Sequence, residues 1–326
     1  MTSTFGTVSP PPSRIGLGLA AVGRPGYITL GRQADLPAVR SAEALKERAF
    51  ALMDAAYAHR VRYFDAARSY GLAETFLAQW LAARPDVTDV TIGSKWGYTY
   101  TAGWRTEADV HEVKDHSVGA YLRQVAETRA VLGDRLDLYQ IHSVTPDSPA
   151  LGDTALHERL ARLAAENVII GLSTSGPRQA ETIRAALAVT VDGQPLFGSV
   201  QTTYNLLERS AGDALADAHA AGRTVIVKEA LANGRLAGPH LTAPELGPVR
   251  EIARETGTSC DAVALAAVIA RPWADVVLSG AATVDQLTSN LAAGQVRLDP
   301  AQLDRLEEAA EPAGEYWARR SRLAWN

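Results

Sequence analysis

Short apolar runs alternate with longer amphipathic stretches along most of this chain. The apolar runs are rich in Val, Ile and Leu and predict buried strands, whereas the stretches between them repeat apolar residues at helical spacing and predict helices. The predicted strands span residues 14–22, 61–65, 90–97, 136–144, 168–173, 199–203, 224–228 and 276–279. The predicted helices span residues 41–60, 72–83, 117–132, 154–166, 178–187, 211–221, 244–255, 259–270 and 283–293.

This alternation predicts parallel strands joined by right-handed crossover connections. Eight such strands close naturally into a (β/α)8 barrel, so we expect an α/β fold, a TIM barrel formed as a single domain by residues 14–313. An open doubly wound sheet is the alternative. Gly16, Gly18 and Ala21 match its dinucleotide fingerprint formally, but Pro25 follows too soon for the helix that this fingerprint requires.

Four segments fall outside the alternation. Residues 1–13 are rich in proline and predict a flexible tail, and residues 300–310 predict one further helix. Residues 96–116 are polar with several aromatic residues, and their length predicts a functional loop. The aromatic and basic segment 314–326 is expected either to fold over the barrel mouth or to fray.

Composition narrows the class of protein. With 326 residues and 47% hydrophobic content the chain can bury a large core, and a net charge of −5 gives no electrostatic reason for a nucleic-acid or anionic-membrane partner. We therefore expect a small-molecule ligand. The single cysteine, Cys260, excludes an internal disulfide, and no histidine spacing indicates a metal site. The chain shows no secretory signal and no apolar run of membrane-spanning length, so a cytoplasmic protein is expected. Its oligomeric state stays open.

Polar residues end three successive predicted strands. Asp65, Lys95 and His142 stand at these ends, and Tyr70 follows the first of them. Because the carboxyl ends of the strands form the active-site face of a barrel, we expect the four side chains to converge. Singly, each has a structural explanation, such as an ion pair, a cap on the core or a hydrogen-bonded core histidine. Jointly, their position favours catalysis.

The chemistry of these four residues suits a carbonyl substrate. The Tyr70 phenol would exchange a proton with the carbonyl oxygen, and the Lys95 ammonium would lower its pKa. Asp65 would hold Lys95 in place and limit that shift. His142 would donate a hydrogen bond to the same oxygen and orient the substrate.

In order and local sequence these residues resemble the catalytic tetrad of the aldo-keto reductase superfamily. The resemblance rests on the Asp-x4-Tyr spacing of Asp65 and Tyr70, on Lys95 in GSKWG and on His142 in LYQIHS, and it covers nearly the whole chain. It implies a barrel that binds NAD(P) across its mouth without a Rossmann fold. It also implies hydride transfer between the nicotinamide and an aldehyde, ketone or sugar carbonyl or lactol, with Tyr70 as general acid and base.

The resemblance also implies cofactor contacts. Two positions match residues that hold the nicotinamide carboxamide, two match the loop over the pyrophosphate, and four match the segment that grips the adenosine half. In this order they are Ser173 and Gln201, Leu231 and Gly234, and Gly280, Thr283, Gln286 and Asn290.

Three positions depart from the family pattern. Thr174 replaces an asparagine after Ser173, and Lys228 stands where the family offers an aromatic ring to the nicotinamide. Ala282 replaces the cation that pairs with the 2′-phosphate of NADP. We expect NADP(H) as cofactor on family frequency, with NAD(H) as a close alternative.

Tryptophans near the expected mouth suggest where the substrate binds. Trp96, Trp104 and Trp317 would contact the apolar or sugar-like face of a carbonyl compound. Two other functions are open on the sequence. One is a Schiff-base lyase that uses Lys228 or Lys95, and the other is a non-catalytic subunit that senses the nucleotide.

Overall fold

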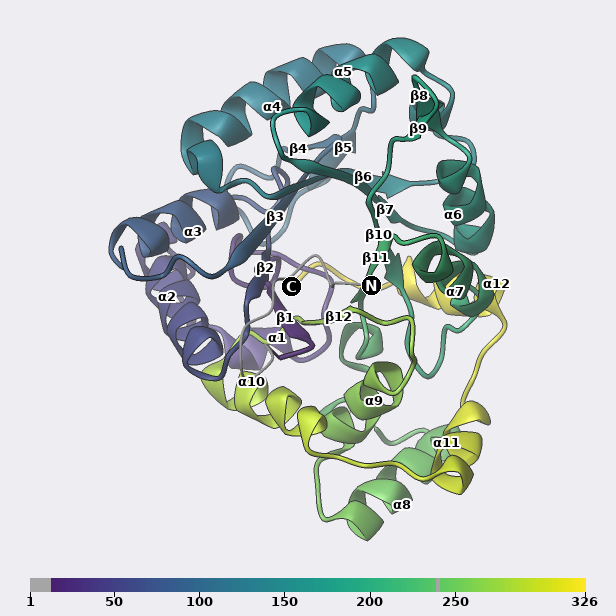
Figure 1. Cartoon of the computed structure of the whole chain (residues 1–326). Helices are drawn as coiled ribbons and strands as arrows, with labels where there is room; N and C mark the ends of the chain where they lie inside the picture. The colour runs from purple at the N-terminus through teal and green to yellow at the C-terminus, as the bar shows by residue number, and fades with distance from the viewer. Residues whose placement is uncertain (1–12, 239–240) are drawn as a thin grey trace.

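In the computed structural model, which describes residues 13–238 and 241–326, parallel strands close into a barrel (Figure 1). Around the barrel, the order of hydrogen-bonded strands is β1 (Ile15–Gly18), β2 (Tyr63–Asp65), β3 (Thr91–Trp96), β6 (Leu138–Val144), β7 (Ile169–Thr174), β10 (Ser199–Thr203), β11 (Thr224–Lys228) and β12 (Val276–Ser279), which pairs with β1. The predicted TIM barrel is confirmed. Residues 1–12 of the predicted tail lie outside the described residues.

Helices form the outer ring around these strands (Figure 1). They are α2 (Ala42–Ala58), α3 (Ala73–Ala82), α4 (Val118–Leu132), α5 (Thr154–Ala164), α6 (Gln179–Leu187), α7 (Gly212–Ala220), α9 (Cys260–Ile269) and α10 (Val284–Leu291). Several begin at a capping side chain: Ser41, Ser117 and Ser259 each accept a hydrogen bond from the backbone N–H three residues ahead. Such caps satisfy amide groups that a helix start leaves free, and so fix where each helix begins.

Side chains fill the barrel interior. Tyr63, Leu138 and Ile226 form a buried cluster there with Val276 and Leu278. Room for the Tyr63 ring comes from glycine, since a Cβ atom at Gly93 would lie 2.3 Å from the Tyr63 hydroxyl oxygen. Because side chains alternate along a strand, residues two positions beyond this layer point inward at the carboxyl end of the barrel.

The predicted loop 96–116 contains structure that the sequence analysis missed. Strands β4 (Tyr98–Tyr100) and β5 (Glu112–Lys114) pair as an antiparallel hairpin. The sequence predicted a functional loop here but not these two strands, because the long connection between them carries no tight-turn signal. The short helix α1 (Arg32–Asp35) and the strands β8 (Thr190–Val191) and β9 (Gln194–Pro195) were also not predicted.

The segment 314–326 does not fray. Most of its first part belongs to helix α12 (Ala313–Arg320), and the chain then returns to the barrel mouth. There Tyr27 and Asn326 exchange two backbone hydrogen bonds of 3.1 Å each. Residues from this segment, including Arg320 and Trp325, line a cavity together with Asp65 and Tyr70.

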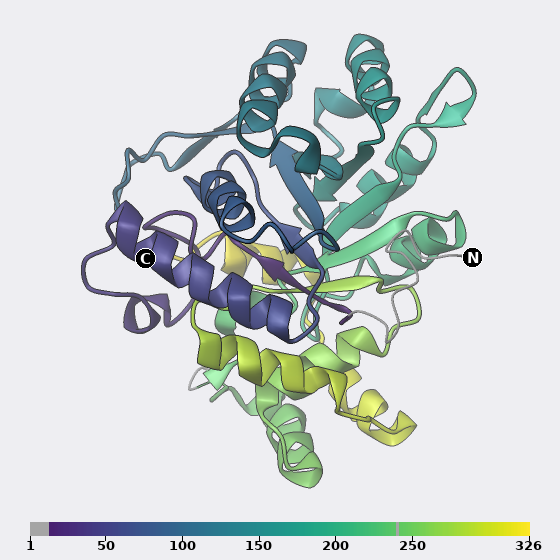
Figure 2. The same ribbon diagram turned by 60° about the vertical axis from the view of Figure 1, so that its left-hand side comes forward.

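Two helices lie outside the ring. Figures 1 and 2 both show α8 (Gly247–Thr256) and α11 (Pro300–Glu307) side by side at its outer edge. Arg305 joins them through ion pairs of 2.8 Å to Glu251 and to Glu255. Short 3-10 turns are η1 (Gly133–Arg135), η2 (Pro149–Leu151), η3 (Ala232–Gly234), η5 (Pro244–Leu246) and η6 (Ala292–Gly294). No helix in the described part of the chain has both the length and the apolar content that a membrane span requires.

Candidate active site

Strand alternation brings the four predicted catalytic residues to one end of the barrel. Asp65 and Lys95 each stand two residues beyond the interior positions Tyr63 and Gly93, and His142 ends the corresponding run on β6. Asp65, Tyr70 and His142 line a cavity of about 740 Å³, and Lys95 lies fully buried beneath it. The tetrad residues therefore lie together at the carboxyl ends of the strands.

Asp65 and Lys95 form a buried ion pair. The Lys95 ammonium contacts the Asp65 carboxylate and also donates to the Ala66 carbonyl at 2.9 Å. The other Asp65 oxygen accepts hydrogen bonds from the Tyr63 hydroxyl at 3.1 Å and from Gln201 Nε2 at 2.8 Å. Such a network offsets the cost of removing two charges from water, so the pair holds its geometry without solvent.

Tyr70 contacts a cation through its ring. Lys95 Nζ lies 4.9 Å from the ring centroid, and Arg24 Cζ lies 5.5 Å from it. Burial and the Asp65 carboxylate raise the pKa of Tyr70 well above its usual value, while Arg24 lowers it. The expected lowering by Lys95 does not prevail, since burial has the largest effect and Asp65 neutralises Lys95. The phenol is therefore protonated at neutral pH and can donate a proton.

His142 is held as a neutral imidazole. Burial and the nearby cations Lys95 and Lys228 bring the pKa of His142 well below its usual range. Its ring meets the rings of Tyr70 and Tyr98 edge-on, with centroids 5.5 and 5.1 Å away. Its Nδ1 atom has no hydrogen-bond partner among residues 13–238 and 241–326. A neutral imidazole carries one N–H, which suits donation to a carbonyl oxygen.

Arg24 is a site residue that the sequence analysis missed. Its guanidinium is buried, donates to the Ser69 carbonyl at 2.7 Å and pairs with Glu112 of the hairpin at 2.8 Å. It also lies 4.7 Å from the Trp325 ring. Arg24 thus joins the Tyr70 loop, the β4–β5 hairpin and the end of the chain. Its position in a turn after β1 gave no periodic signal.

Most of the predicted cofactor residues line the same cavity as the tetrad, and two do not. Ser173 is fully buried, and its Oγ accepts a hydrogen bond from the Ser143 amide at 2.7 Å. Thr283 caps α10 by accepting a hydrogen bond from the Gln286 amide at 3.1 Å. The cavity-lining members of the set are Gln201, Lys228, Leu231, Gly234, Gly280, Gln286 and Asn290.

These residues fit a nicotinamide nucleotide. Gln201 Oε1 is buried without a hydrogen-bond partner in the described part of the chain, so an amide N–H of a ligand could satisfy it. The Gln286 side chain accepts from the Ala282 amide at 2.8 Å and shapes the loop before α10. The N-terminus of α10 opens on the cavity nearby, and such an end favours phosphate groups.

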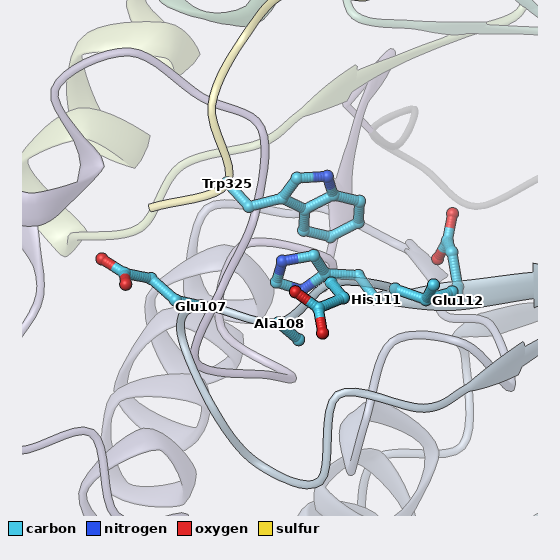
Figure 3. Close-up of a pocket in the computed structure, with 7 residues that line it drawn as sticks. Glu107, Ala108, His111, Glu112 and Trp325 are labelled. Carbon is cyan, nitrogen blue, oxygen red and sulfur yellow. The ribbon is translucent and has the colours of Figure 1, made fainter.

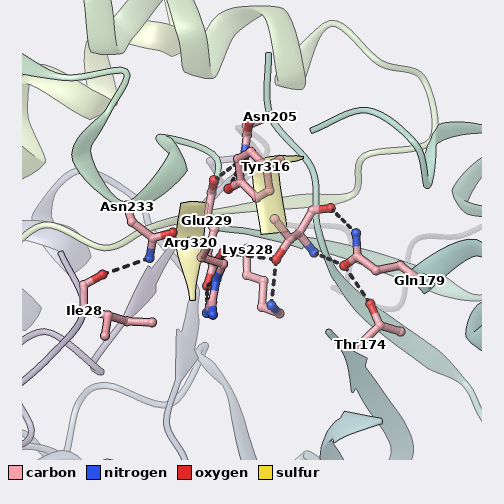
Figure 4. Close-up of polar contacts among 10 residues, drawn as sticks. Ile28, Thr174, Gln179, Asn205, Lys228, Glu229, Asn233, Tyr316 and Arg320 are labelled. Atoms are coloured by element: carbon pink, nitrogen blue, oxygen red, sulfur yellow. Dashed lines mark hydrogen bonds and ion pairs between the residues drawn. The ribbon is translucent and has the colours of Figure 1, made fainter. Parts of the chain in front are cut away.

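Lys228 ends β11, and Glu229 follows it directly (Figure 4). The Lys228 ammonium donates to Thr203 Oγ1 at 2.7 Å, and burial lowers its pKa to about 8. Glu229 accepts two hydrogen bonds from Arg320 Nε, at 2.8 and 3.0 Å. Although burial opposes ionisation, Arg320 and Lys228 lower the pKa of Glu229 to about 2.

The tryptophans predicted to bind substrate lie outside the lining of this cavity. Trp96 is fully buried, with its ring 5.2 Å from that of Tyr121. Trp104 donates to the Arg40 carbonyl at 2.9 Å. Trp317 packs in a separate buried cluster that includes residues of α8, α9 and α11. The aromatic residues at the cavity besides Tyr70 are Tyr27, Tyr98 and Trp325.

Trp325 also covers the hairpin. Figure 3 shows its indole lying over the His111 imidazole, with ring centroids 4.1 Å apart and the planes inclined by 4°. A second cavity, of about 470 Å³, lies between Trp325 and residues 107–112. Within the ranges that the structure covers, no group of His, Cys, Asp and Glu side chains is placed to hold a metal ion.

A parallel barrel with an Asp–Lys pair, a tyrosine and a histidine at its mouth defines a class of barrel oxidoreductases. The sequence model of the Aldo/keto reductase family matches residues 14–311. The chain belongs to this family and is an oxidoreductase that depends on NAD(P). The predicted resemblance is therefore confirmed.

Individual relatives agree with this assignment. An uncharacterized oxidoreductase of Mycobacterium tuberculosis (strain ATCC 25618 / H37Rv) is 28% identical over 323 residues, which cover 91% of this chain and 89% of that protein. The aldo-keto reductase str7 of Strobilurus tenacellus is 23% identical over 303 residues, 83% of this chain and 84% of that protein. A solved aldo-keto reductase from Bacillus halodurans, in its holo form, has a TM-score of 0.69 at 21% identity and covers 93% of each chain, which shows the same fold.

Proposed function

We propose that this protein interconverts an aldehyde, ketone or sugar carbonyl or lactol with its reduced or oxidised partner, with NADP(H) as preferred cofactor and Tyr70 as general acid and base. The observation that carries the proposal is the meeting of Asp65, Tyr70, Lys95 and His142 at one end of a cavity of about 740 Å³. The cavity has the size of ordinary small-molecule sites.

Each residue has a distinct role in this reaction. The Tyr70 hydroxyl and a His142 N–H hold the carbonyl oxygen, and Tyr70 gives that oxygen its proton as the carbon is reduced. Asp65 holds the Lys95 ammonium in place next to the Tyr70 ring. A bound nicotinamide supplies or takes up the hydride. Tyr27, Tyr98 and Trp325 offer the substrate an apolar face at the mouth.

The cofactor is held along the cavity wall. Gln201 would accept a hydrogen bond from the nicotinamide amide at its free Oε1, and Ser173 would position the neighbouring backbone through its hydrogen bond with the Ser143 amide. Leu231 and Gly234 line the cavity and would lie along the pyrophosphate. Gly280, Gln286 and Asn290 line it at the adenosine end, next to the α10 start that Thr283 caps.

The preference for NADP(H) is supported by an arginine from another element. Ala282 offers no charge, but Arg48 Nη1 of α2 donates to the Ala282 carbonyl at 3.2 Å. This contact places a guanidinium at the loop in which Ala282 replaces the expected cation. Asp285 lines the cavity nearby and opposes a phosphate, which keeps NAD(H) as a close alternative.

Replacing Tyr70 with Phe tests the proposal. The Tyr70→Phe change removes the proton donor and little volume, so turnover of a carbonyl panel should fall by at least about a hundredfold. Nicotinamide fluorescence should show that NADPH and NADH still bind to this variant. The control is Tyr57→Phe, which alters a tyrosine on α2 away from the cavity and should leave turnover unchanged. Comparable turnover in Tyr70→Phe would defeat the assignment.

Borohydride trapping, together with the turnover and binding measurements, separates the two alternative functions. The family assignment already disfavours a Schiff-base lyase, and borohydride treatment with a carbonyl substrate should trap no adduct on Lys228 or Lys95. Wild-type protein that binds nucleotide but turns over no substrate in the panel would instead support the sensing subunit.

A further inference from the structure

We propose that Lys228 sets the redox balance of the bound cofactor: its cation at the barrel mouth weakens binding of the oxidised nicotinamide relative to the reduced one. This inference rests on the proposed function, because it requires the nicotinamide to enter the cavity that contains Tyr70. It assigns a role to a residue that the proposed mechanism does not otherwise use.

The position of Lys228 follows from strand alternation. Ile226 belongs to the interior cluster of the barrel, and Lys228 stands two residues further along β11, so its side chain starts inward at the mouth. In the sheet register Lys228 is opposite Thr203 on β10. Two residues before Thr203 on the same strand, Gln201 donates to Asp65 at 2.8 Å. Lys228 therefore belongs to the same inner wall as the catalytic group.

The charges around Lys228 compensate its cation only in part, since Glu229 attracts it without a direct ion pair. Among residues 13–238 and 241–326, no carboxylate lies within 4.0 Å of Lys228 Nζ, and its hydrogen bond goes to a neutral hydroxyl. The adjacent Glu229 is bound by the Arg320 guanidinium, as Figure 4 shows. Lys95 is matched by Asp65. The excess positive charge on this wall therefore resides on Lys228.

The reaction changes the charge of the nicotinamide ring. In carbonyl reduction a bound, neutral dihydronicotinamide would supply the carbonyl carbon with a hydride and its two electrons, while Tyr70 gives a proton to the oxygen. The ring is left with one positive charge. Hydride transfer needs the ring within roughly 3–3.5 Å of that carbon, whose oxygen Tyr70 and His142 hold. A cation on the same wall repels the oxidised ring, because the field is weakly screened at a partly buried site.

On the protein, the equilibrium between the bound forms should therefore shift toward NADPH and the carbonyl, and NADP⁺ should dissociate more readily once the carbonyl has been reduced. Lys228 would leave the affinity for NADPH almost unaffected while lowering that for NADP⁺. An aromatic ring at this position would discriminate less between the two forms, since it carries no net charge. The departure from the family pattern at Lys228 thus has a physical consequence.

Binding measurements on three proteins test the inference. The dissociation constants of NADPH and NADP⁺ would be measured by fluorescence and calorimetry at pH 7 for wild type, Lys228→Met and Lys228→Arg. In Lys228→Met the ratio of the NADP⁺ to the NADPH constant should fall about tenfold, which corresponds to about 30 mV for a two-electron couple. Lys228→Arg keeps the charge and should keep the ratio. Lys46→Met, which removes a partly exposed cation from α2, is the control and should change neither constant.

The outcomes distinguish this inference from others. An unchanged ratio of the two dissociation constants in Lys228→Met would overturn it. Equal weakening of NADP⁺ and NADPH binding, as expected if Lys228 contacts a phosphate, is one such result. An equal fall in Lys228→Met and Lys228→Arg would show a steric cause and would also overturn it. Failure of wild type to bind either nucleotide would refute the proposed function itself. Circular dichroism and urea midpoints of each variant confirm that the compared proteins are folded.

Discussion

Two cations lie near the Tyr70 ring, and each is paired with a carboxylate. Lys95 is matched by Asp65 within the core, whereas the charge of Arg24 is shared with Glu112 on the hairpin. Arg24 lowers the pKa of Tyr70 against the larger effect of burial. We therefore interpret Arg24 as a positioning residue that makes the phenol easier to deprotonate.

Replacing Arg24 with Met should separate the two directions of the reaction. Loss of the cation should raise the pKa of Tyr70 further, because Arg24 is a nearby positive charge that lowers it. Alcohol oxidation at pH 9 needs the phenolate and should fall about tenfold more than carbonyl reduction at pH 7. Arg24→Lys should recover part of the difference. Equal losses in both directions would indicate a purely structural role. The control is Arg62→Met, which removes a cation that contacts the Tyr57 ring and not that of Tyr70.

A second residue-scale prediction concerns nucleotide choice. Arg48→Met should weaken NADP binding about tenfold or more and leave NAD binding unchanged, because a charged hydrogen bond contributes about 1.5–3 kcal/mol. Ala282→Arg should move the preference toward NADP. Titrating both nucleotides against each variant checks this, and a constant NADP/NAD ratio would place the 2′-phosphate elsewhere.

Single residues show what the sequence could and could not predict. Asp65, Lys95 and His142 were recognisable because a polar residue ending an apolar strand is unusual. The position of Trp96 follows from the same rule, since it is adjacent to the inward-facing Lys95 and must face outward against α4. Arg24 could not be found this way, because the groups that accept hydrogen bonds from its guanidinium are 45 or more residues away in the chain.

At the scale of elements, the mouth is covered by pieces from distant parts of the chain. The β4–β5 hairpin, the segment around Tyr27 and the chain end meet through Arg24, Trp325 and the His111 ring. Alternation predicted each barrel strand and helix because those are local patterns. It could not predict this cover, which depends on contacts between separate loops.

Trp325→Ala should open the cover. An aromatic contact is worth about 0.5–1.5 kcal/mol beyond its buried area, so KM for a bulky apolar carbonyl should rise roughly tenfold. Cofactor binding should change little, since the nucleotide-lining residues at β11 and α10 remain in place. Steady-state kinetics and fluorescence titration measure the two effects. The control, Val39→Ala, alters an exposed side chain, and an unchanged KM in Trp325→Ala would argue against the cover.

At the scale of the whole molecule, closure of the barrel was predictable and its interior was not. The barrel strands are short apolar runs, which favours strands buried on both faces. The Tyr63 ring fits only because Gly93 has no side chain, and this contact between two strands is seen only in the folded structure. The return of the C-terminal segment to the mouth likewise depends on a pair of residues that lie 91 positions apart: Glu229, directly after β11, and Arg320 of α12.

The Glu229–Arg320 pair should make stability depend on pH in a defined direction. The pKa of Glu229 in the folded protein is about 2, below the ordinary value of 4.5, so its contribution is complete above pH 4.5 and is lost as the pH falls toward 2. At pH 7, Glu229→Gln leaves Arg320 without its counter-charge and should lower the free energy of unfolding by about 3 kcal/mol. Urea unfolding at pH 7, 4.5 and 3 should show the difference between wild type and variant shrinking as the pH falls. Glu255→Gln, at an exposed carboxylate, should change little at any pH, and a wild-type advantage that stays constant to pH 3 would contradict the assignment.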